Sequence, residues 1–342
     1  MSSSKIGAVI AAVVVIGGII WFASGSKPAE QTKLTIAQIS IAYSSVSEIA
    51  NEMNYFKDNG LNASVQSVAA GPDVVTALRS PQGADIGTIA VTPVATMIGA
   101  GDNPVVIATM MTSDEQVQLA TFTKNGITAD PSTLKGKKIG YIANTNGHIY
   151  LSRLLEKGGL TKDEVTLVAG KPADLVNLLV KGDIDAAVIW DPFIEQAKKA
   201  YGDQLTAKTV PDRGEYVAYN DKSLYSTAFN IVTTKEKLAA NKPAIEAFLR
   251  SLIQSESYIK QNPADAQKKL ETWLKLQPGD LDHFMKTSSL HVELNVPQMT
   301  KWLGDERTWL GTVQDVKDTR TDMRQFVDSS ILESVDASRV TK

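Results

Sequence analysis

Short apolar runs of strand length alternate with segments whose apolar residues recur at helical spacing through the first part of the chain. A helix buries residues three and four positions apart, whereas a strand buries a short continuous or alternating run. Predicted strands and helices follow one another, starting with a strand, at 34–43, 46–53, 63–68, 71–78, 84–89, 91–98 and 105–111. This short-period alternation predicts an α/β unit with a mainly parallel sheet and helices on both faces.

A second alternation begins after an extended stretch, 115–124, and a turn-rich stretch, 128–133. Residues 205–210 close it, and residues 226–234 then have the pattern of a further strand. Everything after Lys235 is predicted to be helical. The strands and helices predicted for the second alternation, again starting with a strand, are 139–142, 149–155, 165–168, 173–180, 184–190 and 192–201.

The order of these segments predicts two lobes joined by two connections. A chain that builds one α/β unit, crosses to a second and crosses back can bend where it crosses, which predicts a hinge. We expect the first lobe to comprise 33–122 and 225–342 and the second lobe to comprise 123–224, with a separate N-terminal hydrophobic helix and linker at 1–32.

Polar turns follow the predicted strands, and we expect them to form a binding site. Ligands of doubly wound sheets bind beyond the carboxyl ends of the strands, where the first N–H groups of the following helices favour an anion. Most residues of these turns are small, hydroxylated or amide-bearing, so they suit a small anion or zwitterion. The candidate ligand-binding residues are Tyr43, Ser44, Ser45, Gly71, Thr92, Thr112, Asn144, Asn146, Gly147, His148, Trp190 and Asp191.

Composition and motifs argue against several other classes of protein. The 342 residues carry a net charge of −3, and no cluster of Lys and Arg interleaved with aromatic residues indicates nucleic-acid binding. The chain has no cysteine, which excludes disulfides, thiolate metal sites and a cysteine nucleophile. It also lacks the sequence motifs of phosphate loops, dinucleotide-binding turns, nucleophile elbows and zinc proteases. We therefore predict a binding protein with no catalytic residue, cofactor or metal ion.

The N-terminus predicts a membrane-directed segment. Lys5 precedes an uninterrupted apolar run of 18 residues, 6–23. At about 1.5 Å per residue the run would span about 27 Å, close to the roughly 30 Å of bilayer hydrocarbon. An uncleaved anchor in the inner membrane and a cleaved signal peptide both fit, and in either case the remaining residues would work outside that membrane.

Two motifs about fifty residues apart carry a resemblance to a known family. The first is Asp-Pro-Ser-Thr-Leu-Lys-Gly-Lys-Lys-Ile-Gly-Tyr at 130–141, and the second is Lys-Gly-Asp-Ile-Asp-Ala-Ala-Val-Ile-Trp-Asp-Pro-Phe at 181–193. With the turn 144–148 they resemble the substrate-binding proteins of nitrate, sulfonate and taurine ABC importers. The similarity extends over about residues 33–260.

The resemblance implies a type II periplasmic-binding-protein fold of the Venus-flytrap kind, which passes a small solute to an ABC permease and its ATPase without chemistry. It also implies that an anionic head lies near 144–148, that Trp190 lines the cleft, and that Ser44 and Ser45 face it from the other lobe. Asp191 stands where some relatives have an uncharged residue, so a ligand with an amine, such as taurine, would fit.

Each of the sharper assignments has a simpler alternative. His148 could donate to an oxyanion or serve only in packing, and Trp190 could line the cleft or only cap a buried strand. Asp191 could bind a ligand amine or only cap the helix that starts at Pro192, which is the more common use of an aspartate in that position. His283 and His291 are predicted to be structural.

Together these features predict the periplasmic solute-binding component of an ABC importer, tethered to the inner membrane if residues 6–23 are retained. Its expected ligand is a small sulfonate or taurine-like zwitterion, captured by hinge closure. The alternatives are the same fold binding nitrate, bicarbonate, a short carboxylate or a thiamine-precursor pyrimidine, a pyrimidine-precursor synthase, and a tethered sensor ectodomain.

Overall fold

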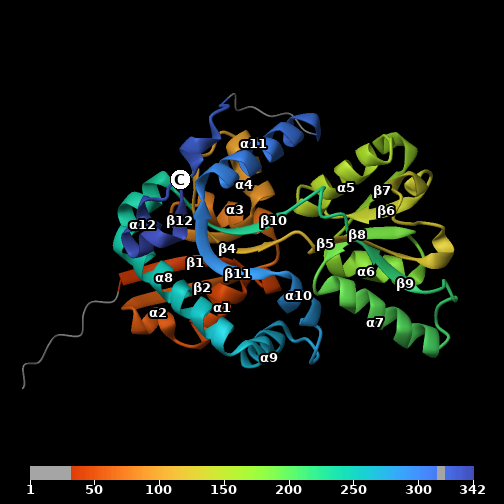
Figure 1. Ribbon diagram of the computed structural model, residues 1–342, viewed down its shortest axis with the longest axis horizontal. Helices are drawn as coiled ribbons and strands as arrows, with labels where there is room; N and C mark the ends of the chain where they lie inside the picture. Colours follow the sequence, from red (N-terminus) through yellow and green to blue (C-terminus); the bar gives the residue numbers. More distant parts are fainter. Residues whose placement is uncertain (1–31, 314–319) are drawn as a thin grey trace, which may run out of the picture. The chain divides into compact units, whose positions relative to one another are not determined.

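The computed structural model describes residues 32–313 and 320–342 (Figure 1). The predicted membrane-directed segment, 6–23, lies outside these residues. In the described ranges, no helix combines the length and the apolar character that crossing a bilayer requires. The described residues belong to one compact unit that contains two β-sheets.

The first sheet has seven strands and mixed directions (Figure 1). In spatial order the strands are β12 (Val340–Thr341), β11 (Ser289–Asn295), β4 (Pro104–Ser113), β10 (Thr227–Thr234), β3 (Ile86–Ala90), β1 (Thr32–Ile39) and β2 (Leu61–Val68). β1 is parallel to β2 and β3, whereas β10 and β11 run antiparallel to β4. The predicted parallel arrangement therefore holds for β1 to β3 and is wrong for the strands that return from later in the chain.

The second sheet has five strands, in the order β7 (Thr166–Ala169), β6 (Lys138–Tyr141), β8 (Ala186–Trp190), β5 (Val117–Phe122) and β9 (Tyr216–Tyr219). β6 is parallel to β7 and β8, and β5 is antiparallel to β8 and β9. β5 thus pairs within the second sheet although its residues fall in the range expected for the first lobe. β9 was not predicted from the sequence.

The helices between the strands form because apolar residues recur on one face. In α6 (Pro172–Lys181), Leu175, Val176, Leu179 and Val180 are buried at helical spacing, and the helix ends at Gly182, whose φ of 89° suits glycine. The α-helices that precede residue 262 are α1 (Ser45–Glu52), α2 (Tyr55–Asp58), α3 (Gly71–Arg79), α4 (Val91–Gly99), α5 (Asn146–Lys157), α6, α7 (Phe193–Thr206) and α8 (Lys235–Gln261).

The strands at the centre of the first sheet are buried on both sides. All five residues of β3 are buried, and so are nine of the ten residues of β4. Continuous apolar runs of this kind are typical of strands covered by helices on both faces. Short 3₁₀ segments occur at η1 (Ala42–Ser44), η2 (Thr123–Asn125), η3 (Pro131–Leu134), η4 (Lys162–Glu164), η5 (Met323–Phe326) and η6 (Ala337–Arg339).

The segment after Lys235 is not wholly helical, which corrects the prediction. It contains α9 (Pro263–Leu274), α10 (Asp282–Thr287), α11 (Val296–Val313) and α12 (Ser330–Asp336), but also β11 and β12. In β11, Leu290, Val292 and Leu294 alternate with more exposed residues and pack into the core of the first sheet. This period of two was present in the sequence and is typical of a strand.

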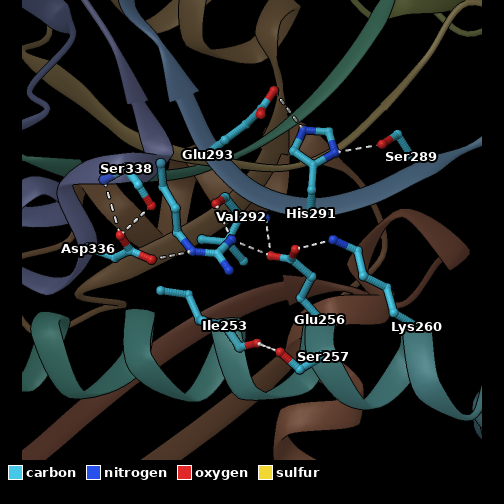
Figure 2. A network of polar contacts seen from close by, with 11 residues as sticks. Ile253, Glu256, Ser257, Lys260, Ser289, His291, Val292, Glu293, Asp336 and Ser338 are labelled. Carbon is cyan, nitrogen blue, oxygen red and sulfur yellow. Dashed lines mark hydrogen bonds and ion pairs between the residues drawn. The ribbon is translucent and has the colours of Figure 1, made fainter.

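A polar network holds these late segments to α8 (Figure 2). The buried carboxylate of Glu256 accepts hydrogen bonds from the Val292 N–H at 2.8 Å and from Arg339 at 2.6 Å, and it pairs with Lys260 one helical turn away. Arg339 also pairs with Asp336 at 3.1 Å. Because a buried carboxylate needs such partners, Glu256 ties β11 and the last residues of the chain to α8.

Candidate functional site

A cavity of about 230 Å³ lies where strands of both sheets end. Its lining follows the carboxyl ends of β1, β2 and β3 in the first sheet and of β6, β7 and β8 in the second. The lining residues are Ile39, Ser40, Ile41, Tyr43, Ala69, Ala70, Gly71, Ala90, Pro93, Ile142, Thr145, Asn146, Lys171, Pro172, Ala173, Trp190, Phe193 and Phe229. Two wider grooves, of about 690 and 780 Å³, open at the opposite strand ends and are not where α/β sheets bind ligands.

Helices of both sheets begin at this cavity. The lining includes at least one residue directly before or within the first turn of each of α3, α4, α5, α6 and α7. Gly71 allows α3 to start close to α4, because a Cβ at this position would lie 2.6 Å from Cγ of Pro93. The free N–H groups and positive dipole ends of several helices therefore favour negative charge in the cavity.

Three buried hydrogen-bond donors in the lining have no partner within the described part of the chain. They are the hydroxyl of Tyr43, the side-chain NH₂ of Asn146 and the indole N–H of Trp190, in residues that are 2%, 4% and 8% exposed. Buried polar groups are normally hydrogen-bonded, and leaving one unpaired costs about 1–3 kcal/mol. Donors of this kind require acceptor atoms, which the oxygens of a ligand can supply.

Local contacts orient two of these donors. The Gly147 N–H donates to Oδ1 of Asn146 at 3.0 Å, which leaves the NH₂ end of that amide available. Gly147 also lies against Trp190, since a Cβ on Gly147 would be 3.3 Å from the indole ring. Burial, and next the charge of Asp191, raise the pKa of Tyr43 well above its usual value, so its hydroxyl stays protonated as a donor.

Asp191 follows the lining residue Trp190 in the chain and is fully buried. Its Oδ2 accepts a hydrogen bond at 2.6 Å from Nδ1 of His283, which α10 contributes, while its Oδ1 has no partner among the described residues. The peptide bond between Asp191 and Pro192 is cis. The hydrogen bond from His283 to Asp191 raises the pKa of His283, although partial burial of the imidazole lowers it. Asp191 therefore joins the end of β8 to α10.

The structure brings some of the predicted site residues to the cavity and not others. Tyr43, Gly71, Asn146 and Trp190 line it. Ser44 and Ser45 are buried beside it, where their hydroxyls donate to the carbonyl oxygens of Ile39 and Ala42. The predicted residues that do not line the cavity are Ser44, Ser45, Thr92, Thr112, Asn144, Gly147, His148 and Asp191.

Most of the predicted residues outside the lining make contacts elsewhere in the fold. Thr92 lies beside Glu306 and Tyr225, and Thr112 pairs with neighbouring strands in β4. Asn144 is exposed with a φ of 58°. The ring of His148 meets the ring of Trp309 edge-on at 4.9 Å, and its Nδ1 accepts a hydrogen bond from the Asn144 N–H at 3.3 Å.

Several lining residues were missed by the sequence analysis. Lys171 provides the only charged side chain of the lining and stands directly before Pro172 at the start of α6. Thr145 directly precedes α5 in the predicted turn 144–148, and Phe193 follows the Trp-Asp-Pro motif, so both had a sequence signal. Phe229 had none, because its place in the lining depends on β10 returning beside β3.

Comparison with known proteins places the chain in a family. A family model described as NMT1/THI5 like matches residues 45–266, more than half of the chain. The chain belongs to the NMT1/THI5-like family. This confirms the family relationship that the two sequence motifs indicate.

Relatives of this NMT1/THI5-like protein include binding proteins and an enzyme. A Brucella abortus protein named as a binding protein is 26% identical over 277 residues, covering 80% of each chain. The taurine-binding periplasmic protein of Escherichia coli is 24% identical over 268 residues, 77% of this chain and 76% of the relative. A 4-amino-5-hydroxymethyl-2-methylpyrimidine phosphate synthase of Candida albicans is 26% identical over 223 residues, 64% of each chain.

Solved structures share the fold. The alkanesulfonate-binding protein SsuA of Xanthomonas axonopodis pv. citri, bound to MOPS, matches with a TM-score of 0.72 at 20% identity and covers 88% of this chain and 100% of its own. At 20% identity the match supports a shared fold and nothing more. The two-sheet α/β fold of a periplasmic binding protein is thereby confirmed.

Proposed function

We propose that this protein is the periplasmic solute-binding component of an ABC importer and that it holds a small sulfonate or related oxyanion in the cavity at the strand ends. The observation that carries the proposal is the set of three buried, unpartnered donors of Tyr43, Asn146 and Trp190. Acceptor oxygens are what such donors require. Lys171 and the helix starts around the cavity add positive potential.

The chemistry of the lining favours binding over catalysis. Lys171 and Tyr43 carry the only ionisable side chains of the lining, the Tyr43 hydroxyl stays protonated, and no histidine or carboxylate in the lining could act as a general base toward Ser40 or Thr145. Asp191, outside the lining, is engaged by His283. A synthase relative exists, but a synthase would need a reactive group in contact with its substrate.

We also propose that the two sheets belong to two lobes that close around the ligand. The chain crosses between the sheets after β4 and again after β9. Glu115 in the first crossing pairs with Lys222 in the second at 2.6 Å. A lobe boundary before Val117, rather than at 122, would keep the whole second sheet in one lobe.

Isothermal titration of the full-length protein tests the proposal. The ligands would be ethanesulfonate, benzenesulfonate, taurine, nitrate, bicarbonate, acetate and a hydroxymethylpyrimidine, each against the native chain and Lys171→Met. We expect at least one oxyanion to bind and Lys171→Met to weaken it roughly threefold to tenfold, the equivalent of about 1 kcal/mol for a partly solvated charge.

Lys181→Met provides a matched control, because Lys181 is an exposed lysine at the other end of α6. It should leave the affinity unchanged. Equal losses of affinity in the two variants would show that Lys171 does not belong to the site. Binding of the hydroxymethylpyrimidine alone would show that the ligand is a pyrimidine and not an oxyanion. Conversion of the hydroxymethylpyrimidine to a product would show that the protein is an enzyme.

A further inference from the structure

The wall of the cavity is aromatic to a degree that the polar donors do not explain. Tyr43, Trp190, Phe193 and Phe229 all line it. They come from η1, from the end of β8, from the start of α7 and from β10, so elements of both sheets contribute. The rings of Tyr43 and Phe229 meet edge-on at 5.5 Å with an angle of 72° between their planes. Such rings offer faces and edges to another flat ring.

The rest of the lining is also mostly apolar. The lining also includes Ile39, Ile41, Ile142, Ala90 and Pro93. Two of the unpartnered donors, the hydroxyl of Tyr43 and the N–H of Trp190, are themselves the polar edges of aromatic side chains. The cavity therefore offers a few donors and one cation within a large apolar wall.

In this conformation the cavity is larger than the smallest ions require. One water molecule takes about 30 Å³ of liquid, so 230 Å³ corresponds to several water molecules. Nitrate or bicarbonate would satisfy the donors and leave most of the apolar wall against water. A ligand that carries an apolar body beside its anionic group would cover that wall.

We propose that the ligand is an aromatic anion, a sulfonate or carboxylate attached directly or by a short link to an aromatic ring. This deepens the proposed function and rests on it. The anionic oxygens take the hydrogen bonds of Tyr43, Asn146 and Trp190, and the ring of the ligand packs among the aromatic side chains of the cavity.

A titration series on the full-length protein tests this inference. Benzenesulfonate and hexanesulfonate have the same number of carbons and the same head group, so their ratio reports the aromatic character and the rigidity of the ring together. We expect benzenesulfonate to bind about threefold to tenfold more tightly than hexanesulfonate, the range that aromatic pairing adds. Methanesulfonate, taurine and nitrate should bind at least tenfold more weakly than benzenesulfonate, because each buried CH₂ adds about fourfold. Benzoate shows whether a carboxylate replaces the sulfonate.

Phe193→Leu removes one aromatic ring at the half-buried edge of the cavity. It should reduce the ratio of benzenesulfonate to hexanesulfonate affinity toward one while leaving hexanesulfonate binding nearly unchanged. Phe56→Leu is the control, because Phe56 stacks on Phe248 away from the cavity, at 5.5 Å between ring centroids, and should leave the ratio intact.

The outcomes separate the two proposals. Tighter binding of hexanesulfonate, taurine or nitrate than of benzenesulfonate would overturn the aromatic inference and leave the binding function standing. Failure of every anion in the series to bind would overturn the binding function itself. An unchanged affinity ratio in Phe193→Leu, with the protein folded, would contradict the assignment of the ring to this cavity.

Discussion

Tyr43 and Tyr150 are both buried tyrosines, but only one of their hydroxyls has a partner. The hydroxyl of Tyr150 accepts a hydrogen bond from the Asp221 N–H at 2.9 Å. The hydroxyl of Tyr43 has no partner within the described residues and lines the cavity. Its place in the lining makes the Tyr43 hydroxyl a candidate donor to the proposed ligand.

Tyr43→Phe should therefore separate affinity from stability. Removing an unpartnered hydroxyl costs no protein hydrogen bond, so the free energy of unfolding without ligand should be unchanged or slightly higher. Loss of a hydrogen bond to an anion should weaken binding roughly tenfold to a hundredfold. Urea denaturation and isothermal titration with benzenesulfonate measure the two quantities.

Tyr150→Phe supplies the contrast, with a loss of about 1 kcal/mol in stability and little change in affinity. If Tyr43→Phe instead behaved like Tyr150→Phe, the Tyr43 hydroxyl would be structural and the anion site would lose one of its three donors.

The sequence indicated the turn 144–148, part of which lines the cavity, but could not tell which of its residues do so. Asn146 does, and the turn residue Thr145 lines it too. His148, the residue with the most distinctive chemistry, points to Trp309 instead. That contact joins α5 to α11, far along the chain, and no local pattern encodes it. The local sequence thus indicates the turn, whereas long-range packing determines which residues of the turn line the cavity.

At the scale of elements, the periodicity of apolar residues predicted the strands and helices that alternate regularly. It failed after Lys235, where strands and helices no longer alternate in short periods. The prediction of helix for residues 289–295 is wrong, because Leu290, Val292 and Leu294 of β11 alternate strictly with more exposed residues. β10 was found, but its antiparallel direction depends on which strands it joins. Direction and sheet membership are tertiary properties, so they could not be derived from runs of apolar residues.

α10 contributes a contact that the sequence treated as structural only. It presents His283 to the buried Asp191 at the end of β8. Because the hydrogen bond to Asp191 raises the pKa of His283, the protonated histidine stabilises the fold. This contribution is fully present below the usual histidine pKa of about 6.5 and is lost as the pH rises through the higher pKa of the folded state.

His283→Gln should remove this pH dependence. We expect it to cost about 1–3 kcal/mol at pH 6 and clearly less at pH 9, because it leaves Asp191 without its charged partner. Urea denaturation across this pH range measures the difference. An equal loss at both values would mean that His283 contributes by packing alone.

His291→Gln should behave in the opposite way. Burial lowers the pKa of His291, so the folded state is penalised as the pH falls below the usual histidine value. Replacing it should therefore make the protein less sensitive to acid, which provides a control with the reverse sign.

At the scale of the whole molecule, α11 links regions that are distant in the sequence. It packs against α4 of the first sheet, its Trp309 meets His148 of α5, and its Glu306 accepts a hydrogen bond at 2.8 Å from Tyr225, which lies in the second crossing between the sheets. This late helix was predicted, but its partners were not, because they follow from the complete fold. α11 therefore joins elements of both sheets where the chain crosses.

Glu306 makes this junction sensitive to pH. Burial raises its pKa to about 7, although Thr92, Tyr225 and Arg153 act to lower it. Between its usual value of 4.5 and about 7, the folded state keeps the proton while the unfolded chain releases it. The free energy of unfolding should therefore fall as the pH rises through this window. At about 1.4 kcal/mol per pKa unit the whole effect is about 3 kcal/mol.

Glu306→Gln tests this assignment, because the amide keeps an oxygen that accepts from Tyr225 but cannot ionise. The variant should match the native protein at pH 5 and exceed its stability by about 1–3 kcal/mol at pH 8, as urea denaturation would measure. Glu52→Gln is the matched control, since Glu52 is an exposed glutamate that pairs with Lys269 at 2.9 Å, far from this junction in the sequence, and its replacement should leave the pH slope unchanged. His283 contributes at higher pH and keeps its contribution in both variants. If the free energy of unfolding of Glu306→Gln fell between pH 5 and 7 as steeply as that of the native protein, a group other than Glu306 would cause the pH dependence.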